Sequence, residues 1–146
     1  MKAHNTIKLT IQSLPENIPL ARVTVAAFIA QLDVTVDQLE DIKVAVSEAI
    51  SNAIIHGYEH RPNEWVEIEV SRFDETFQIV VRDYGKGIED VEAALKPAYS
   101  TDSERMGLGF VFMQSFMDEV KVTSEVGKGT TVVLIKHLAP GKDAPN

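Results

Sequence analysis

The sequence predicts one α+β domain, a two-layer sandwich in which helices cover one face of a mostly antiparallel sheet. Residues 5–12, 64–72 and 76–83 alternate apolar with polar side chains, which is the period of half-buried strands. A long apolar-periodic run after Thr35 has the period of a helix instead. The 146 residues fit a single domain, 1–146, and their 45% hydrophobic content is enough for one core.

The first half of the chain is expected to hold two helices after its first strand. Residues 20–32 place apolar side chains at helical spacing. Thr35 and Gln38 form a capping-box pattern that opens a helix from Val36 to about His56, where Gly57 stops it. This long helix is the clearest element of the sequence.

The second half contains a long irregular connection, residues 84–107, with a short helical stretch near 89–95. Connections of this length are usually functional or mobile. Three further elements are expected in order: a helix at 108–117 and the strands of a final hairpin at 119–125 and 129–137. The last residues, 138–146, are predicted to form a frayed tail.

The charge and composition exclude several classes of partner. The 22 acidic residues against 14 basic ones give a net charge of -8, which opposes binding to nucleic acid backbones. If the protein acts on transcription, the charge implies that it does so through a protein partner and not by binding DNA or RNA itself. The sequence has no cysteine, no export-signal pattern and no run of the ~20 apolar residues that a membrane span needs, so the cytoplasm is expected.

Glu48, Asn52 and His56 are the first candidate site. Their spacing of four residues puts them in one stripe along the long helix, flanked by apolar side chains. A carboxylate and an amide in such surroundings need partners, because burying them unpaired is costly. A metal with bound phosphates would provide partners, and hydrogen bonds within the protein at a helix edge would do so equally well.

Three glycine-rich segments are further candidates. Asp83–Ile88 follows a strand, and Gly85 and Gly87 would let a flat ligand approach the backbone, although an ordinary turn has the same composition. Gly107–Gly109 is placed at a predicted helix start, where unpaired N–H groups could meet phosphate, or where the helix is merely flexible. Gly129–Thr131 leads the last strand and alone indicates only a turn.

Taken together and in this order, the four segments resemble the sequence boxes of the GHKL ATPases, which include histidine kinase catalytic domains and DNA gyrase. The patterns are E-x-x-x-N on a helix, D-x-G-x-G after a strand, G-x-G-F, and G-T-T before the last strand. Four longer stretches are similar to the anti-sigma F factors of spore-forming bacteria, and the resemblance covers nearly the whole chain: Ala21–Phe28, Val46–Ala49, Asn52–Tyr58 and Phe116–Val120.

The resemblance implies a GHKL (Bergerat) fold that binds ATP and Mg²⁺. Glu48 would be the general base, Asn52 would coordinate magnesium, and Asp83 would accept a hydrogen bond from the adenine amino group. Arg105 would contact the transferring phosphoryl group, and Arg22 would lie on a sigma-binding surface, although Arg22 taken alone favours a solvated charge. The remaining nucleotide contacts would be His56, Gly85, Gly87, Ile88, Gly107, Leu108, Gly109 and Thr130.

The activity implied is transfer of phosphate from Mg-ATP to a serine of an anti-anti-sigma antagonist, by a homodimer that also binds a sporulation sigma factor. One alternative is a histidine kinase catalytic domain, which normally follows a dimerising helical hairpin for which this chain has no room. The other is an ATP-dependent anti-sigma module without transfer activity. The segment Ala98–Met106 keeps that second alternative open, because it looks shorter than in the family and carries Asp102 where a basic residue is usual.

Overall fold

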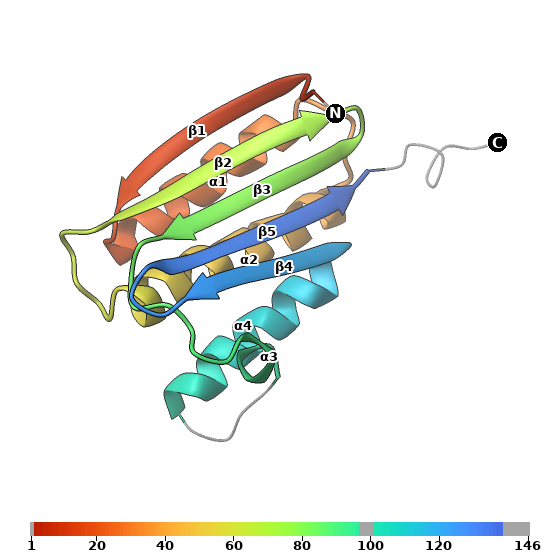
Figure 1. The fold of residues 1–146 in the computed structure, drawn as a ribbon. Helices are drawn as coiled ribbons and strands as arrows, with labels where there is room; N and C mark the ends of the chain where they lie inside the picture. Colours follow the sequence, from red (N-terminus) through yellow and green to blue (C-terminus); the bar gives the residue numbers. More distant parts are fainter. Residues whose placement is uncertain (1, 97–100, 139–146) are drawn as a thin grey trace.

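The five strands form one antiparallel sheet with the helices on one of its faces (Figure 1). The computed structural model describes residues 2–96 and 101–138, and of residues 101–105 only the backbone. The sheet order is β1-β2-β3-β5-β4, which confirms the predicted two-layer α+β sandwich. The strands are β1 (Asn5–Gln12), β2 (Trp65–Phe73), β3 (Thr76–Asp83), β4 (Glu119–Glu125) and β5 (Gly129–His137).

The strand predictions agree with the structure to within one residue at each end, because alternation and turn residues both mark the boundaries. The β2–β3 hairpin turns at Asp74, which has a positive φ of 54°. The β4–β5 hairpin turns at Gly127, with a φ of 81°. Since β5 lies between β3 and β4, Asp83 at the end of β3 is the register partner of Thr130 at the start of β5.

The long helix is confirmed, including its cap. The Thr35 side chain accepts from the Gln38 N–H at 3.1 Å, and the Gln38 side chain accepts from the Thr35 N–H at 3.0 Å. The helical elements are the 3₁₀ turn η1 (Pro15–Asn17), α1 (Ile18–Ile29), α2 (Val36–Asn52), the π-helical turn η2 (Ala53–Gly57), α3 (Val91–Ala94) and α4 (Thr101–Phe116). Helix α1 therefore begins two residues earlier, and ends three residues earlier, than expected.

Helix α4 differs most from its prediction, because it begins at Thr101 and not at Leu108. Met106, Phe110 and Met113 are spaced for one helical face, and the last two are fully buried. A glycine inside a helix costs only about 1 kcal/mol relative to alanine. Burial of this apolar face therefore outweighs Gly107 and Gly109, which lie inside the helix.

The core lies between the sheet and the helices. Helix α2 packs against both α1 and α4, so it occupies the middle of the helical layer. Phe28 of α1 meets Phe77 of β3 edge to face, with ring centroids 6.1 Å apart. The fully buried aliphatic side chains on both layers include Ile29, Ile42, Ile50, Ile68, Ile79 and Leu134.

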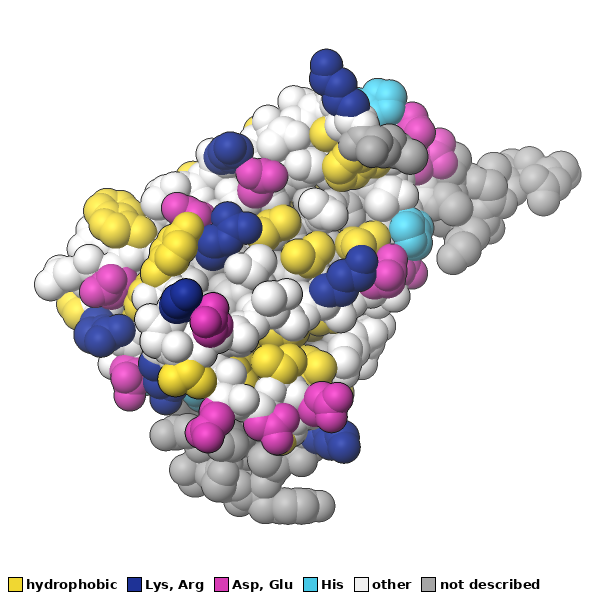
Figure 2. Space-filling model, in the orientation of Figure 1, with side chains coloured by type: hydrophobic (Ala, Val, Ile, Leu, Met, Phe, Trp, Pro, Cys, Tyr) yellow, Lys and Arg dark blue, Asp and Glu magenta, His cyan; other side chains and the backbone are white. Residues whose placement is uncertain are grey.

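The opposite face of the sheet carries cationic and anionic side chains between apolar ones (Figure 2). Lys8 pairs with Glu69, and Arg82 pairs with Glu67, both at 3.7 Å. None of the described helices is long and apolar enough to cross a membrane. Of the predicted tail, Leu138 is buried and its N–H bonds to the Glu75 carbonyl at 2.7 Å, so fraying does not begin there; residues 139–146 lie outside the described part.

Candidate functional site

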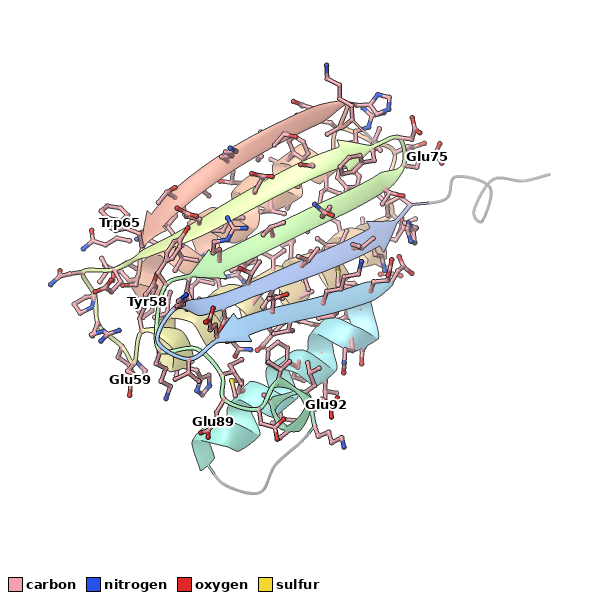
Figure 3. All side chains as sticks on the ribbon, in the orientation of Figure 1. Tyr58, Glu59, Trp65, Glu75, Glu89 and Glu92 are labelled. Carbon is pink, nitrogen blue, oxygen red and sulfur yellow. The ribbon has the colours of Figure 1, made fainter. Side chains whose placement is uncertain are left out.

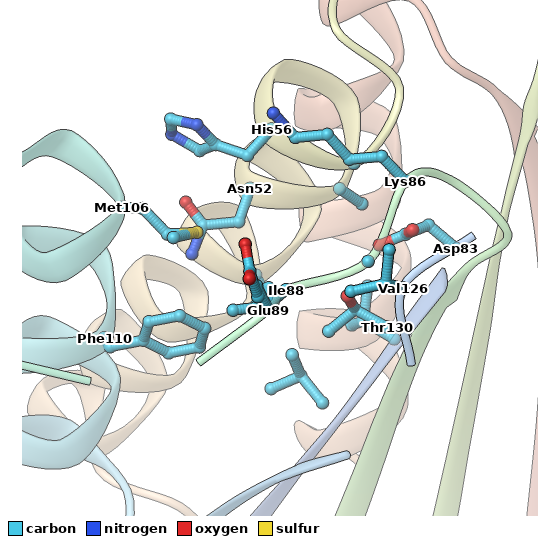
Figure 4. Close-up of a pocket in the computed structure, with 16 residues that line it drawn as sticks. Asn52, His56, Asp83, Lys86, Ile88, Glu89, Met106, Phe110, Val126 and Thr130 are labelled. Carbon is cyan, nitrogen blue, oxygen red and sulfur yellow. The ribbon is translucent and has the colours of Figure 1, made fainter. Parts of the chain in front are cut away.

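A cavity of about 490 Å³ opens at the end of the sheet where β3 ends and β5 begins. Helix α2 with η2 forms one wall, and α4 forms another (Figure 4). Its size suits a drug-sized or nucleotide-sized ligand. The residues that line it include Ala49, Asn52, His56, Gly57, Asp83, Lys86, Gly87, Ile88, Glu89, Met106, Phe110, Val126 and Thr130.

Asp83 is the buried charge of this cavity, with only 5% of its surface exposed. Its Oδ1 accepts the Gly85 N–H at 2.9 Å. Burial raises the pKa of the Asp83 carboxyl to about 6, against the lowering effect of backbone hydrogen bonds from Gly85 and Thr130. The side chain lies against Gly57, where a Cβ atom would be 2.7 Å from Oδ1. Only glycine at position 57 leaves room for this carboxylate.

The segment after Asp83 is fixed from the side of η2 by Tyr58. The fully buried Tyr58 hydroxyl accepts the Tyr84 N–H at 2.8 Å and donates to the Trp65 carbonyl at 2.5 Å. Tyr58 and Trp65 lie at the same end of the sheet (Figure 3). Two residues after Tyr84, the Lys86 N–H donates to the Gly57 carbonyl at 2.9 Å. A Cβ at Gly85 would overlap that same carbonyl, so the close approach requires glycine.

The same segment is fixed from the other side by the β4–β5 hairpin. The Ile88 N–H donates to the Ser124 hydroxyl at 2.7 Å, and the Gly127 N–H donates to the Lys86 carbonyl at 2.8 Å. The Ser124 hydroxyl is also 2.8 Å from the Thr130 hydroxyl. Thr130 and Ile88, two of the predicted contacts, are thus linked to one another through a serine of β4.

At the α2 wall, the predicted stripe is partly buried and incompletely paired. Asn52 Nδ2 is buried and has no hydrogen-bond partner in the described part of the chain. Burial raises the pKa of the Glu48 carboxyl. Gly109 of α4 faces both side chains, since a Cβ there would lie 3.0 Å from Glu48 Oε2 and 3.3 Å from the Asn52 amide. The structure therefore brings Glu48, Asn52 and Gly109 together.

The remaining predicted residues divide into three groups. His56, Gly87 and Ile88 line the cavity as expected. Gly107 and Gly109 are buried inside α4 and not at its start, and the Leu108 side chain is 46% exposed and does not line the cavity, so the expected helix N-terminus at these residues is wrong. The Arg105 side chain and the segment Pro97–Ser100 lie outside the described residues.

Three residues of the site were not predicted from the sequence: Tyr58, Ser124 and Gly57. Tyr58 and Ser124 act on backbone groups of a distant segment, and no local pattern marks such contacts. Gly57 was interpreted only as a helix stop. A signal was present in the family resemblance, because the stretch Asn52–Tyr58 contains both Gly57 and Tyr58.

Comparison with known proteins supports the resemblance drawn from the motifs. Residues 11–136 match the model of the histidine kinase-like ATPase domain. The anti-sigma F factor of Anoxybacillus flavithermus is 52% identical over 140 residues, covering 94% of this chain and 96% of that protein. The anti-sigma F factor of Geobacillus kaustophilus is 53% identical with the same coverage. This chain belongs to the anti-sigma F factor family.

Two solved structures have the same fold as this anti-sigma F family member. The RsbU and RsbW domains of Rv1364c from Mycobacterium tuberculosis superpose with a TM-score of 0.67 and 18% identity, covering 91% of this chain and 32% of that one. The blue-light activated histidine kinase EL346 of Erythrobacter litoralis gives a TM-score of 0.59 and 23% identity, covering 84% and 42%. At these identities the likeness concerns the fold alone.

The residues present fit a nucleotide with a magnesium ion, the ligands implied by the ATPase family. The buried Asp83 carboxylate can accept from an amino group, and the unpartnered Asn52 amide faces the same cavity. Magnesium is typically bound by one or two protein oxygens together with phosphates, and the Asn52 amide can supply such an oxygen. The lining also includes the apolar residues Ala49, Ala53 and Ile88, which suit contact with a purine ring.

Proposed function

We propose that this protein is an ATP-dependent serine kinase that also inhibits a sporulation sigma factor. The observation that carries the proposal is one cavity lined by a buried acceptor, Asp83, and by Asn52, with Glu48 outside the lining but beside Asn52 where both face Gly109. The family relationship supports it, because the relatives are named anti-sigma F factors.

The Asp83 end would bind the adenine base. An ionised carboxylate is an acceptor only, so it selects a ligand group that donates, such as an exocyclic amine. Gly57 lets this carboxylate pack against the backbone, and the Gly85 N–H donates to it at 2.9 Å and fixes its direction. The charge-assisted hydrogen bond would provide both affinity and orientation.

The Glu48 end would carry out the transfer. A carboxylate whose pKa is raised by burial is a better proton acceptor, and Glu48 would take the proton from the attacking serine hydroxyl. Asn52 would hold Mg²⁺ through its amide oxygen, and the ion, when bound, would neutralise charge on the phosphates. We extend the proposal to Arg105 as a contact to the γ-phosphate, and to Gly107 and Gly109, whose lack of side chains would let the phosphates approach α4.

The protein partners would be a sigma factor, bound in the cytoplasm, and an anti-anti-sigma antagonist that provides the serine. Arg22 of α1 would lie on the sigma-binding surface; it is partly exposed and does not line the cavity. The active form would be a homodimer, and sedimentation analysis tests that state. Binding of nucleic acid is not part of the proposal, given the net charge of -8.

The decisive experiment combines the purified protein with labelled ATP, its antagonist and its sigma factor. Label on an antagonist serine, together with co-purification of the sigma factor, is the expected result. Sigma binding without any label on the antagonist would instead favour the anti-sigma module that lacks transfer activity. Label on histidine would favour a histidine kinase.

Arg22→Glu separates the two activities in the same assay. Charge reversal should strongly weaken sigma binding while ATP affinity and antagonist phosphorylation stay near the wild-type level. Lys121→Glu, at an exposed position of β4, is the control for the change of charge. Unaltered sigma binding by Arg22→Glu would move the interface elsewhere.

A further inference from the structure

We propose that Ser124 is a positioning residue that sets the direction of the Thr130 hydroxyl and thereby favours adenine over guanine. The inference rests on the proposed nucleotide site. Ser124 lies on the inner face of β4 at the end of the strand and does not itself line the cavity, so it would act through Thr130 and Ile88.

The Ser124 hydroxyl has three polar neighbours. It accepts the Ile88 N–H at 2.7 Å, lies 3.1 Å from the Gly129 carbonyl oxygen, and lies 2.8 Å from the Thr130 hydroxyl. A serine has one hydrogen to donate and two lone pairs. It can therefore donate to Gly129 or to Thr130, but not fully to both.

The two arrangements give the Thr130 hydroxyl opposite hydrogen-bonding roles toward the cavity. If Ser124 donates to Gly129, then Thr130 must donate to Ser124 and can offer the cavity only an acceptor. If Ser124 donates to Thr130, the Thr130 hydrogen can point into the cavity. Thr130 is 92% buried and lines the cavity beside its register partner Asp83, so the choice decides what a ligand meets there.

The chemistry of the purines selects the second arrangement for ATP. The edge of adenine places an amino donor beside a ring-nitrogen acceptor, and guanine places a carbonyl acceptor beside an N–H donor. Asp83 accepts from the adenine amine, so the adjacent ring nitrogen needs a donor, directly or through a water. Ser124 donating to Thr130 makes Thr130 that donor, whereas guanine would face the Asp83 carboxylate with its carbonyl.

Ile88 adds a second reason why the position requires a hydroxyl. Its N–H is held by Ser124, and its side chain lines the cavity. An alanine at position 124 would leave that N–H without its partner and would let the segment after Gly87 shift. The neighbouring Thr123 is exposed on the outer face of β4, where it pairs with Thr131, and provides a matched control.

The test measures ATP and GTP affinity by calorimetry for the full-length wild type, Ser124→Ala and Thr123→Ala. Ser124→Ala removes the hydrogen bond to Thr130 and should therefore bind ATP about three- to tenfold more weakly than the wild type. GTP binding should weaken by a smaller factor, because it loses only the support of the Ile88 segment, so that the ratio of the two affinities narrows. Thr123→Ala should match the wild type with both nucleotides.

A double-mutant cycle with Thr130→Val distinguishes positioning from general stability. If Ser124 acts through Thr130, Ser124→Ala should cost much less ATP affinity in the Thr130→Val background than in the wild type. Additive losses, or equal losses for ATP and GTP, would overturn the proposal and leave Ser124 a purely structural residue. A wild-type protein that binds no ATP would instead overturn the nucleotide site itself.

Discussion

The two ends of the cavity differ in how completely their polar groups are paired. At the Asp83 end, the N–H groups of Tyr84, Gly85, Lys86 and Ile88 each have a hydrogen-bond partner within 2.9 Å. At the other end, next to Glu48, the Asn52 amide nitrogen is buried without a described partner, and Gly109 of α4 faces both side chains.

The difference indicates that the two ends have different tasks. A site that only binds gains affinity when its groups are held in place beforehand, because less order is lost on binding. A site that must accept phosphates, an ion and a serine in turn needs groups whose partners arrive with the ligands. Substitutions at the Asp83 end should therefore change ATP affinity, and substitutions at the other end should change the transfer rate.

Glu48→Gln should produce the largest effect, on the transfer rate. It removes the proposed base while keeping the shape, and loss of a general base costs about 10²–10⁴-fold in rate. ATP affinity should remain near the wild-type value, because Asp83 is intact. Single-turnover transfer to the antagonist and calorimetry on one preparation measure both quantities. A wild-type rate would make Glu48 a structural residue.

Asp83→Asn should affect ATP affinity and not the transfer rate. Replacing the acceptor by an amide removes one charge-assisted hydrogen bond and should weaken ATP binding about 10- to 100-fold. The transfer rate at saturating ATP should stay close to the wild-type rate. Titration with ATP checks the first expectation, and unchanged affinity would contradict the assignment of Asp83. Asp90→Asn, at the exposed cap of α3, is a control for the loss of one carboxylate.

Tyr58→Phe should lower the free energy of unfolding by about 1–3 kcal/mol, because the Tyr84 N–H and the Trp65 carbonyl each lose a partner. Tyr84→Phe removes an exposed hydroxyl that bonds to Glu67, so it should cost much less. Urea denaturation of the two variants compares them. Equal losses would show that the Tyr58 hydroxyl does not fix the Asp83 segment.

The smallest effect is expected from pH. In the proposed site the adenine amine would bind the ionised Asp83 carboxylate, so affinity should fall as pH drops through the raised pKa of about 6. Lowering the pH from about 7.5 to about 5.5 should weaken ATP binding about fourfold through this group. Because the phosphates also titrate, the measured quantity is the ratio of wild-type to Asp83→Asn affinity. A ratio that stays constant would contradict the ionised acceptor.

The sequence predicted the sheet well and α4 poorly, for physical reasons. Alternation specifies a strand locally, so β1 was located from residues 5–12 alone. The start of α4 depends on whether the burial of Met106 and Phe110 outweighs two glycines, which is a tertiary balance that no local pattern records.

The residues that line the cavity could be predicted from the sequence, whereas the residues that support the lining could not. Asp83, Asn52 and Thr130 carry recognisable motif positions, and all three line the cavity. Ser124 lies behind the cavity wall, and its effect depends on the pairing of β4 with β5 and on the approach of Ile88. Such contacts between distant segments appear only once the fold is known.

The π-helical turn η2 has a consequence for which insertions and deletions the chain can tolerate. The Tyr58 N–H bonds to the Ala53 carbonyl, five residues back, so the turn holds one residue more than an α-helical turn. A π-helical turn and an α-helical turn both complete 360°, so deleting one residue from Ala53–His56 should give an ordinary helix end with Gly57 and Tyr58 still nearly in phase. The same deletion within α2 would rotate everything that follows by about 100° and turn Gly57 and Tyr58 away from Asp83 and Tyr84. We therefore expect the chain to tolerate a deletion better in η2 than in α2.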